Sequence, residues 1–309
     1  MSKKTITLWA CMLLATATFA EKIVLKPNWS KGDSRSYSIT NYTDTARSIS
    51  ADMTIEVLDN SNDYLMSCVY SNYQDFTGME ALAETFIGKD KYDKIKAYAP
   101  HYTVSKEGKI LRINNFDEYL KIYESPKDSS NELSSMINKT LASVMKNLLA
   151  SDEKSFMDIN LKEILAQHKH FGQEYDTKKE MKSTANITVN AIIMKDAPSS
   201  TKVVKEAGKT IITTTAELKE KACIKAIQQW MENFMMETAK ETGMDTNDPS
   251  MKKEIEKATK EYKKMKVWAD FEETVIYDTK TGWMISYKSK ETFHSSEGES
   301  SQSTVITPK

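Results

Sequence analysis

The sequence predicts an α+β fold, in which a curved antiparallel sheet (a meander or half-barrel) is packed by several amphipathic helices. Some segments alternate apolar and polar residues with a period of two, as half-buried strands do, for example Tyr64, Met66, Cys68 and Tyr70. Longer segments repeat apolar residues every three or four positions, as helices do. Strands and helices come in alternating blocks rather than in strict strand–helix–strand units, which favours an antiparallel sheet.

The predicted strands fall at both ends of the chain and between the helical blocks. The first meander is expected in residues 23–73, and a hairpin around the Glu107–Gly108 turn is expected next. Strands return from residue 184 to 194, a turn is predicted at Pro198–Ser200, and the stretch 202–215 is broken at Ala207–Gly208. The last predicted elements are a strand at 268–277, its return strand at 283–293, and a loop at 295–303 that precedes a short terminal strand or a frayed end.

Helices are predicted as insertions into this sheet, at about residues 77–99, 117–170 and 219–265. In the last block, Cys223, Ile227 and Met231 lie on one face of a long helix. Asp248 before Pro249 is a favourable start for the helix that follows it. We expect one large domain over residues 21–309.

Residues 1–20 have the pattern of a cleaved signal peptide. Lys3 and Lys4 precede an apolar run at 6–14 that is too short to cross a bilayer, and small residues end at Ala20. Lipidation at Cys11 is a less favoured alternative, because the apolar run continues past that cysteine. The chain is therefore expected to be exported to a periplasmic or extracellular space, and no later stretch is apolar enough to span a membrane.

The charge of the chain gives no case for a nucleic-acid partner. The net charge is −1, and it becomes −3 when the signal peptide takes two lysines and no acidic residue with it. Cys68 and Cys223 would remain in the mature chain. An oxidising compartment permits a bond between them, but their apolar surroundings favour two buried thiols, and the sequence leaves both possibilities open.

No catalytic, cofactor-binding or metal-binding motif is present, so we expect no cofactor and no metal, and a non-enzymatic protein is favoured. His168 and His170 are two residues apart at a predicted helix end, where they are expected to be solvated rather than to share a metal. Glu272 and Glu273 are neighbours on a strand and therefore face opposite sides of the sheet, which excludes a paired acid–base site.

A methionine- and aromatic-rich stretch in the helix of residues 219–245 is the main pointer to a function. Flexible thioether side chains suit adaptable apolar surfaces, although the same residues would also serve as an ordinary core. We expect an exported, non-enzymatic binding protein of the cell envelope that holds a lipid or another hydrophobic molecule in a groove between sheet and helices. The alternatives are a module that docks an envelope protein and, third, an unrecognised hydrolase. The candidate lining residues are Trp230, Met231, Phe234, Met235 and Trp283.

Two short motifs carry a resemblance to a known group of proteins. The mature chain opens with Pro27-Asn-Trp29-Ser-Lys-Gly32-Asp33, and it has Tyr277-Asp-Thr-Lys-Thr-Gly282-Trp283 near its end. In these motifs it resembles exported, uncharacterised proteins of Bacteroidota that begin with a Trp…Gly-Asp…Tyr strand and finish with an Asp-x-x-Thr-Gly hairpin. The resemblance implies an exported protein and implies no catalytic residues.

Overall fold

The computed structural model describes residues 22–309 except 79, 82–83, 85–87, 125–152, 154–155, 158–160, 190–191, 243–248 and 265. The expected signal peptide, and most of the helix expected between residues 125 and 160, lie outside the described residues.

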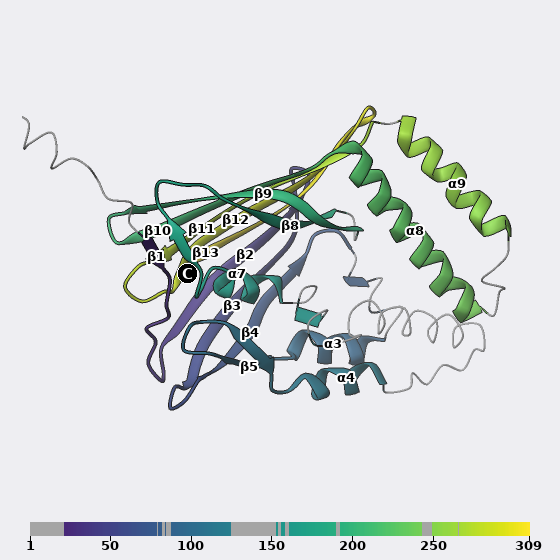
Figure 1. The fold of residues 1–309 in the computed structure, drawn as a ribbon. Helices are drawn as coiled ribbons and strands as arrows, with labels where there is room; N and C mark the ends of the chain where they lie inside the picture. The colour runs from purple at the N-terminus through teal and green to yellow at the C-terminus, as the bar shows by residue number, and fades with distance from the viewer. Residues whose placement is uncertain are drawn as a thin grey trace, which may run out of the picture.

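An antiparallel sheet of eleven strands dominates the structure (Figure 1). Its order is β6-β5-β4-β3-β2-β13-β12-β11-β10-β9-β8, and every neighbouring pair is antiparallel. The strands are β2 (Ser34–Thr43), β3 (Ala46–Asp59), β4 (Tyr64–Asp75), β5 (His101–Val104), β6 (Ile110–Ile113), β8 (Met181–Val189), β9 (Ile192–Glu206), β10 (Lys209–Leu218), β11 (Trp268–Asp278), β12 (Met284–Ser295) and β13 (Gly298–Pro308). A second sheet pairs β1 (Lys22–Val24) with β7 (Glu174–Asp176).

The large sheet consists of two meanders that meet through the ends of the chain. Strands β2 to β6 form one meander and strands β8 to β13 form the other, and the contact between them is the pairing of β2 with β13. The sheet does not close, because its edge strands β6 and β8 are not paired with each other. The antiparallel prediction is confirmed. The α+β class is wrong, because the fold is mainly β: much of the chain between the helices extends into long strands.

Five helices can be followed through the described residues: α3 (Lys89–Ala97), α4 (Phe116–Glu124), α7 (Lys162–His168), α8 (Glu220–Thr242) and α9 (Pro249–Lys264). The short helix α7 lies against the sheet, whereas α8 and α9 lie side by side at one end of the strands (Figure 1). The prediction of two helices within residues 219–265, the second starting at Pro249, is confirmed. Helix α8 packs against the sheet through its first half and extends past the strand ends with its second half, and α9 packs beside it.

The alternating patterns of the N-terminal meander correspond to its buried face. Met53, Ile55 and Val57 are fully buried, and Tyr64, Met66 and Cys68 on the adjacent strand β4 are buried with them. The hairpin around Gly108 is also confirmed, with β5 and β6 on either side of it. A period of two is therefore a reliable guide here, because one face of each strand packs against the core.

Two predicted breaks in the C-terminal half are wrong. Pro198 lies inside β9 and pairs with β8, at the point where the pairing of β9 with β10 ends. Residues 298–308 form the full strand β13, which lies between β12 and β2. Its serine- and threonine-rich sequence resembles a loop, but two strand neighbours hold it in place. The predicted break at Ala207–Gly208 is confirmed as a hairpin turn in which both residues have positive φ.

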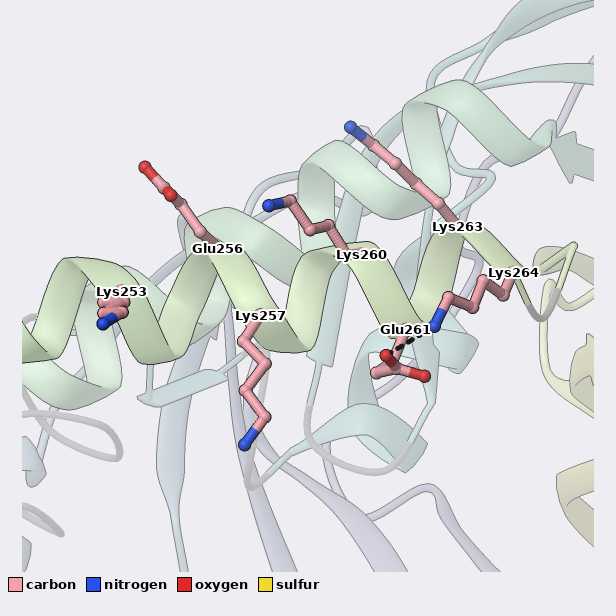
Figure 2. Close-up of a pocket in the computed structure, with 7 residues that line it drawn as sticks. All are labelled: Lys253, Glu256, Lys257, Lys260, Glu261, Lys263 and Lys264. Atoms are coloured by element: carbon pink, nitrogen blue, oxygen red, sulfur yellow. Dashed lines mark hydrogen bonds and ion pairs between the residues drawn. The ribbon is translucent and has the colours of Figure 1, made fainter.

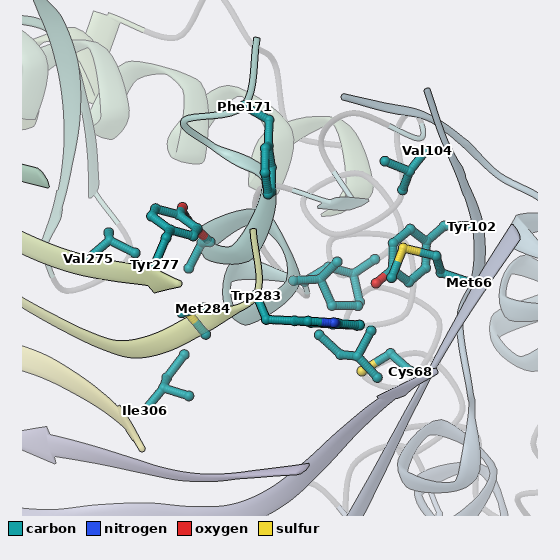
Figure 3. Close-up of a cluster of buried hydrophobic side chains, with 14 of the residues drawn as sticks. Met66, Cys68, Tyr102, Val104, Phe171, Val275, Tyr277, Trp283, Met284 and Ile306 are labelled. Atoms are coloured by element: carbon teal, nitrogen blue, oxygen red, sulfur yellow. Dashed lines mark hydrogen bonds between the residues drawn. The ribbon is translucent and has the colours of Figure 1, made fainter. Parts of the chain in front are cut away.

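Two clusters of buried apolar side chains form the core. The larger lies between α7 and the sheet and includes Met66, Tyr102, Phe171, Tyr277 and Trp283 (Figure 3). The smaller joins α8 to strands β8 to β11. Cys68 belongs to the first cluster and Cys223 to the second, and both thiols are free. The two cysteines therefore serve as small apolar residues, and burial raises the pKa of each thiol.

The two motifs from opposite ends of the chain meet in the larger cluster. The rings of Trp29 and Trp283 lie 4.9 Å apart, and the Asn28 N–H donates a hydrogen bond to the Thr281 carbonyl. Asp278 accepts hydrogen bonds from the backbone N–H groups of Lys280 and Thr281, which fixes the hairpin turn before Gly282. These residues therefore have a structural role, in closing the N-terminal segment onto the β11–β12 hairpin.

Candidate functional site

The structure does not bring the five predicted lining residues together. Trp283 is 2% exposed and belongs to the larger cluster. Trp230, Met231 and Met235 are half-buried on α8, and the side chain of Phe234 lies outside the described residues. Trp283 therefore belongs to the larger cluster, whereas Met231 packs against the smaller one.

Helix α8 has two different halves. In its first half, Cys223, Ile224 and Ile227 are buried against the strands of the smaller cluster. Its second half runs past the strand ends beside α9 (Figure 1). There Met231 and Met235 stay half-buried and Met236 is 44% exposed. This methionine half of α8, residues 230–236, is the apolar surface that the sequence indicates.

A buried ionic cluster, which the sequence did not predict, lies between the end of α7 and the sheet. The carboxylate of Glu273 on β11 is 2% exposed. Both of its oxygens accept hydrogen bonds of 2.8 Å from Lys169 Nζ, and one accepts a hydrogen bond of 3.2 Å from the Tyr287 hydroxyl. His170 Nε2 lies 3.4 Å from the same carboxylate. Glu272 is exposed, so the two glutamates do face opposite sides of the strand.

The pKa of Glu273 reflects these neighbours. Burial is the largest influence and raises the pKa, but the neighbouring His170 imidazole and the hydrogen-bonded ammonium of Lys169 outweigh it and hold the pKa at about 2. The carboxylate is therefore ionised at neutral pH, which suits an ion-pair anchor and not a general acid.

The hydrogen bonds of His170 determine which of its nitrogens carries a proton. Gln173 donates from Nε2 to the Lys169 carbonyl, so its Oε1 accepts from the Tyr175 hydroxyl. The Tyr175 oxygen must then accept from His170 Nδ1, at 2.7 Å. Nε2 of His170 is left facing Glu273. Burial lowers the pKa of His170, and the facing carboxylate opposes that shift.

His168 lies in the larger cluster and not in solvent. It is 5% exposed, its Nδ1 donates to the Gly108 carbonyl at 3.0 Å, and the rings of Trp29 and Tyr102 each lie 5.7 Å from its imidazole. The expectation of a solvated histidine pair is thus wrong for both His168 and His170, because the chain turns back into the core directly after α7. Burial lowers the pKa of His168 to about 4.

The fold should lose stability in mild acid because of His168. Its folded pKa of about 4 lies below its ordinary value of 6.5, so the unfolded chain binds a proton first as the pH falls. The stabilisation is complete above pH 6.5 and is lost progressively towards pH 4, by about 3 kcal/mol in total. Urea unfolding at pH 7, 5.5 and 4.5 measures this loss.

The control for that experiment is a pair of variants. His168→Gln should show a shallower dependence of stability on pH than the unmodified protein, whereas His101→Gln, which changes an exposed histidine, should keep the full dependence. An unchanged slope in His168→Gln would show that other groups cause the acid sensitivity.

The buried cluster holds the end of α7 to the sheet. Within the described ranges, no group of three or more His, Cys, Asp or Glu side chains is placed to bind a metal ion. The signal for Glu273 was present in the sequence, because it shares the strand phase of the apolar residues Phe271, Val275 and Tyr277. The charged partner Lys169 and the adjacent His170 come from a segment about 100 residues away and could not be found by spacing.

Across the described part of the chain, no helix is both long and apolar enough to cross a membrane. No protein-family model matches the sequence, and no curated protein sequence matches it.

Proposed function

We propose that this chain is an exported, non-enzymatic binding protein of the cell envelope that holds a hydrophobic ligand against the methionine half of α8. The observation that carries the proposal is the exposure of this surface. Met236 is 44% exposed, Trp230 and Met235 are half-buried, and Met231 is half-buried at the margin of the smaller core cluster. Unbranched thioethers adapt to ligands of irregular shape, and aromatic rings add apolar area.

This proposal moves the ligand away from Trp283. The environment of Trp283 is filled by protein, with Trp29 at 4.9 Å and the guanidinium of Arg35 over its ring at 5.6 Å. A ligand beside Trp283 would have to displace these side chains. A ligand on α8 would instead cover apolar surface that the described residues leave accessible, which is favourable because the surface is removed from water.

Docking of a protein partner through a sheet edge has less support. At one edge strand, the Ile113 N–H donates to the Glu153 carboxylate, and at the other, the Thr188 N–H donates to Glu291 at 3.0 Å. These acidic side chains occupy a donor on each edge that an added strand would use.

The test combines extraction and a probe. Organic extraction and native mass spectrometry of the purified protein should reveal a bound apolar molecule, and the dye N-phenyl-1-naphthylamine should bind to the extracted protein. The variant Met231→Ser/Met235→Ser/Met236→Ser should weaken dye binding by about tenfold or more, since each substitution removes apolar contact area.

The matched control is Val69→Ser/Leu111→Ser. Val69 and Leu111 are 49% and 55% exposed on the sheet, so this variant also removes exposed apolar side chains, but it should leave dye binding unchanged. Equal loss in both variants, or no loss in the α8 variant, would contradict the proposal. Circular dichroism of each variant checks that the fold is retained.

A further inference from the structure

The outer face of α9 carries a cluster of lysines that lies outside the proposed ligand surface of α8. Figure 2 shows this face, from which the side chains of five lysines and two glutamates extend outward. We call it the lysine face, and it consists of Lys253, Glu256, Lys257, Lys260, Glu261, Lys263 and Lys264. The opposite side of α9 is anchored, since Tyr262 packs against the smaller core cluster and Thr259 is buried.

The lysine face carries a net positive charge, although the chain as a whole is slightly negative. Five lysines against two glutamates give a local charge of +3, whereas the whole chain has a net charge of −1. Lys253, Lys257 and Lys260 are spaced by four and three residues, which places them in one row along the helix. Neighbours in such a row are about 5–6 Å apart, less than the screening length of about 8 Å at physiological salt, so their fields add.

Most of these lysines are not used to stabilise α9 itself. Glu261 forms an ion pair of 2.8 Å with Lys264, which leaves four lysines of the face without an ion-pair partner among the described residues. Glu256 and Lys260 have the spacing of a helical i,i+4 pair, as do Lys257 and Glu261, yet neither pair is formed. Side chains that extend outward without partners keep their charge available to an external anion.

We propose that the lysine face of α9 docks the protein on an anionic phospholipid surface. The inference rests on the proposed function, because a lipid surface would be the source of the hydrophobic ligand of α8. Charge complementarity supports it: several lysines on one helix face are attracted by the negative potential of acidic lipid headgroups. Helices α8 and α9 lie side by side, so docking through α9 brings the methionine half of α8 close to the lipid source.

The experiment is vesicle co-sedimentation of the mature full chain. Vesicles of phosphatidylcholine with 30% phosphatidylglycerol should bind the protein, pure phosphatidylcholine vesicles should not, and 0.5 M NaCl should release it. Each lost lysine should weaken binding roughly fivefold. The variant Lys253→Gln/Lys257→Gln/Lys260→Gln/Lys263→Gln should therefore bind at least about 100-fold more weakly.

The matched control removes the same number of charges elsewhere. Lys178→Gln/Lys179→Gln/Lys195→Gln/Lys209→Gln changes four exposed lysines outside the helices and should bind like the unmodified protein. Equal loss in both variants would overturn the proposal, because the whole-chain charge would then be responsible. Absence of vesicle binding, or capture of heparin but not of vesicles by the same lysines, would overturn it as well.

Ligand binding and docking can fail separately in these measurements. The α9 variant should keep dye binding to α8 in solution, and the α8 methionine variant should keep vesicle binding. If dye binding fails in the unmodified protein while vesicles still bind through α9, the proposed function falls and the docking surface remains. If the dye binds to the unmodified protein but vesicles do not, the ligand site remains supported and the docking surface is contradicted.

Discussion

Gly108→Ala should lower the free energy of unfolding by about 4 kcal/mol. An added Cβ would lie closer than 3.0 Å to three atoms of the Phe171 side chain, which is itself buried. Overpacking of this kind costs about 1–3 kcal/mol, and the positive φ of +92° at Gly108 costs a residue with a Cβ about 1–2 kcal/mol more. Urea unfolding at pH 7 measures the sum.

Gly208→Ala separates the two contributions. Gly208 also has a positive φ, +78°, but a Cβ there would meet nothing within 4 Å. Gly208→Ala should therefore lower the free energy of unfolding only by the cost of a positive φ in a residue with a Cβ, about 1–2 kcal/mol. The double variant Gly108→Ala/Phe171→Leu should lose less free energy of unfolding than the sum of the losses in the two single variants, because the smaller side chain relieves the contact. Equal effects at Gly108 and Gly208 would show that Phe171 moves aside without cost.

Local patterns predicted the elements whose burial alternates regularly. Met53, Ile55 and Val57 show one buried face at a period of two, and α8 and α9 begin and end close to their sequence signals. The pattern failed at Pro198 and in β13. There, pairing with strands from distant parts of the chain keeps residues extended that favour turns or loops, and such pairing has no local signature.

In the candidate site, too, the sequence predicted features within one element but not contacts between elements. The amphipathic pattern of α8 identified its methionines, but it could not show that Trp283 belongs to a different cluster, because that depends on how the two meanders are joined. The short segment after α7 is a second example. His168, Lys169 and His170 look like a solvated helix end, yet each contacts a buried partner from a distant strand or hairpin. Sequence spacing is informative within an element, and these contacts lie between elements.

Lys169→Met should be the most damaging change of a charged side chain in the cluster around Glu273. It leaves a carboxylate that is 2% exposed with His170 and Tyr287 as its remaining partners. Loss of one partner from a buried ion pair costs about 3–5 kcal/mol, and we expect about 3 kcal/mol because Lys169 itself is 41% exposed. Methionine keeps the apolar stem, so the measurement reports the charge.

The free energy of unfolding lost in Lys169→Met should decrease as the pH falls. With Lys169 present, the pKa of Glu273 is about 2, below its ordinary value of 4.5, so the carboxylate stabilises the fold above pH 4.5 and this contribution is lost towards pH 2. Without Lys169 the folded pKa rises, and the variant can protonate Glu273 in mild acid. The difference from the unmodified protein should therefore be largest at pH 7 and smaller at pH 4.5, as urea unfolding at both values would measure.

Two further variants test the cause. Lys22→Met removes an ion pair of similar length, 2.7 Å to Glu174, but both side chains there are more than half exposed, so its effect on stability should be much smaller than that of Lys169→Met. Lys169→Met/Glu273→Gln removes both charges and should be more stable than Lys169→Met alone. If the double variant is no more stable, the loss in Lys169→Met comes from the missing contact of the ammonium with the Phe271 ring, at 5.3 Å, and not from an uncompensated carboxylate.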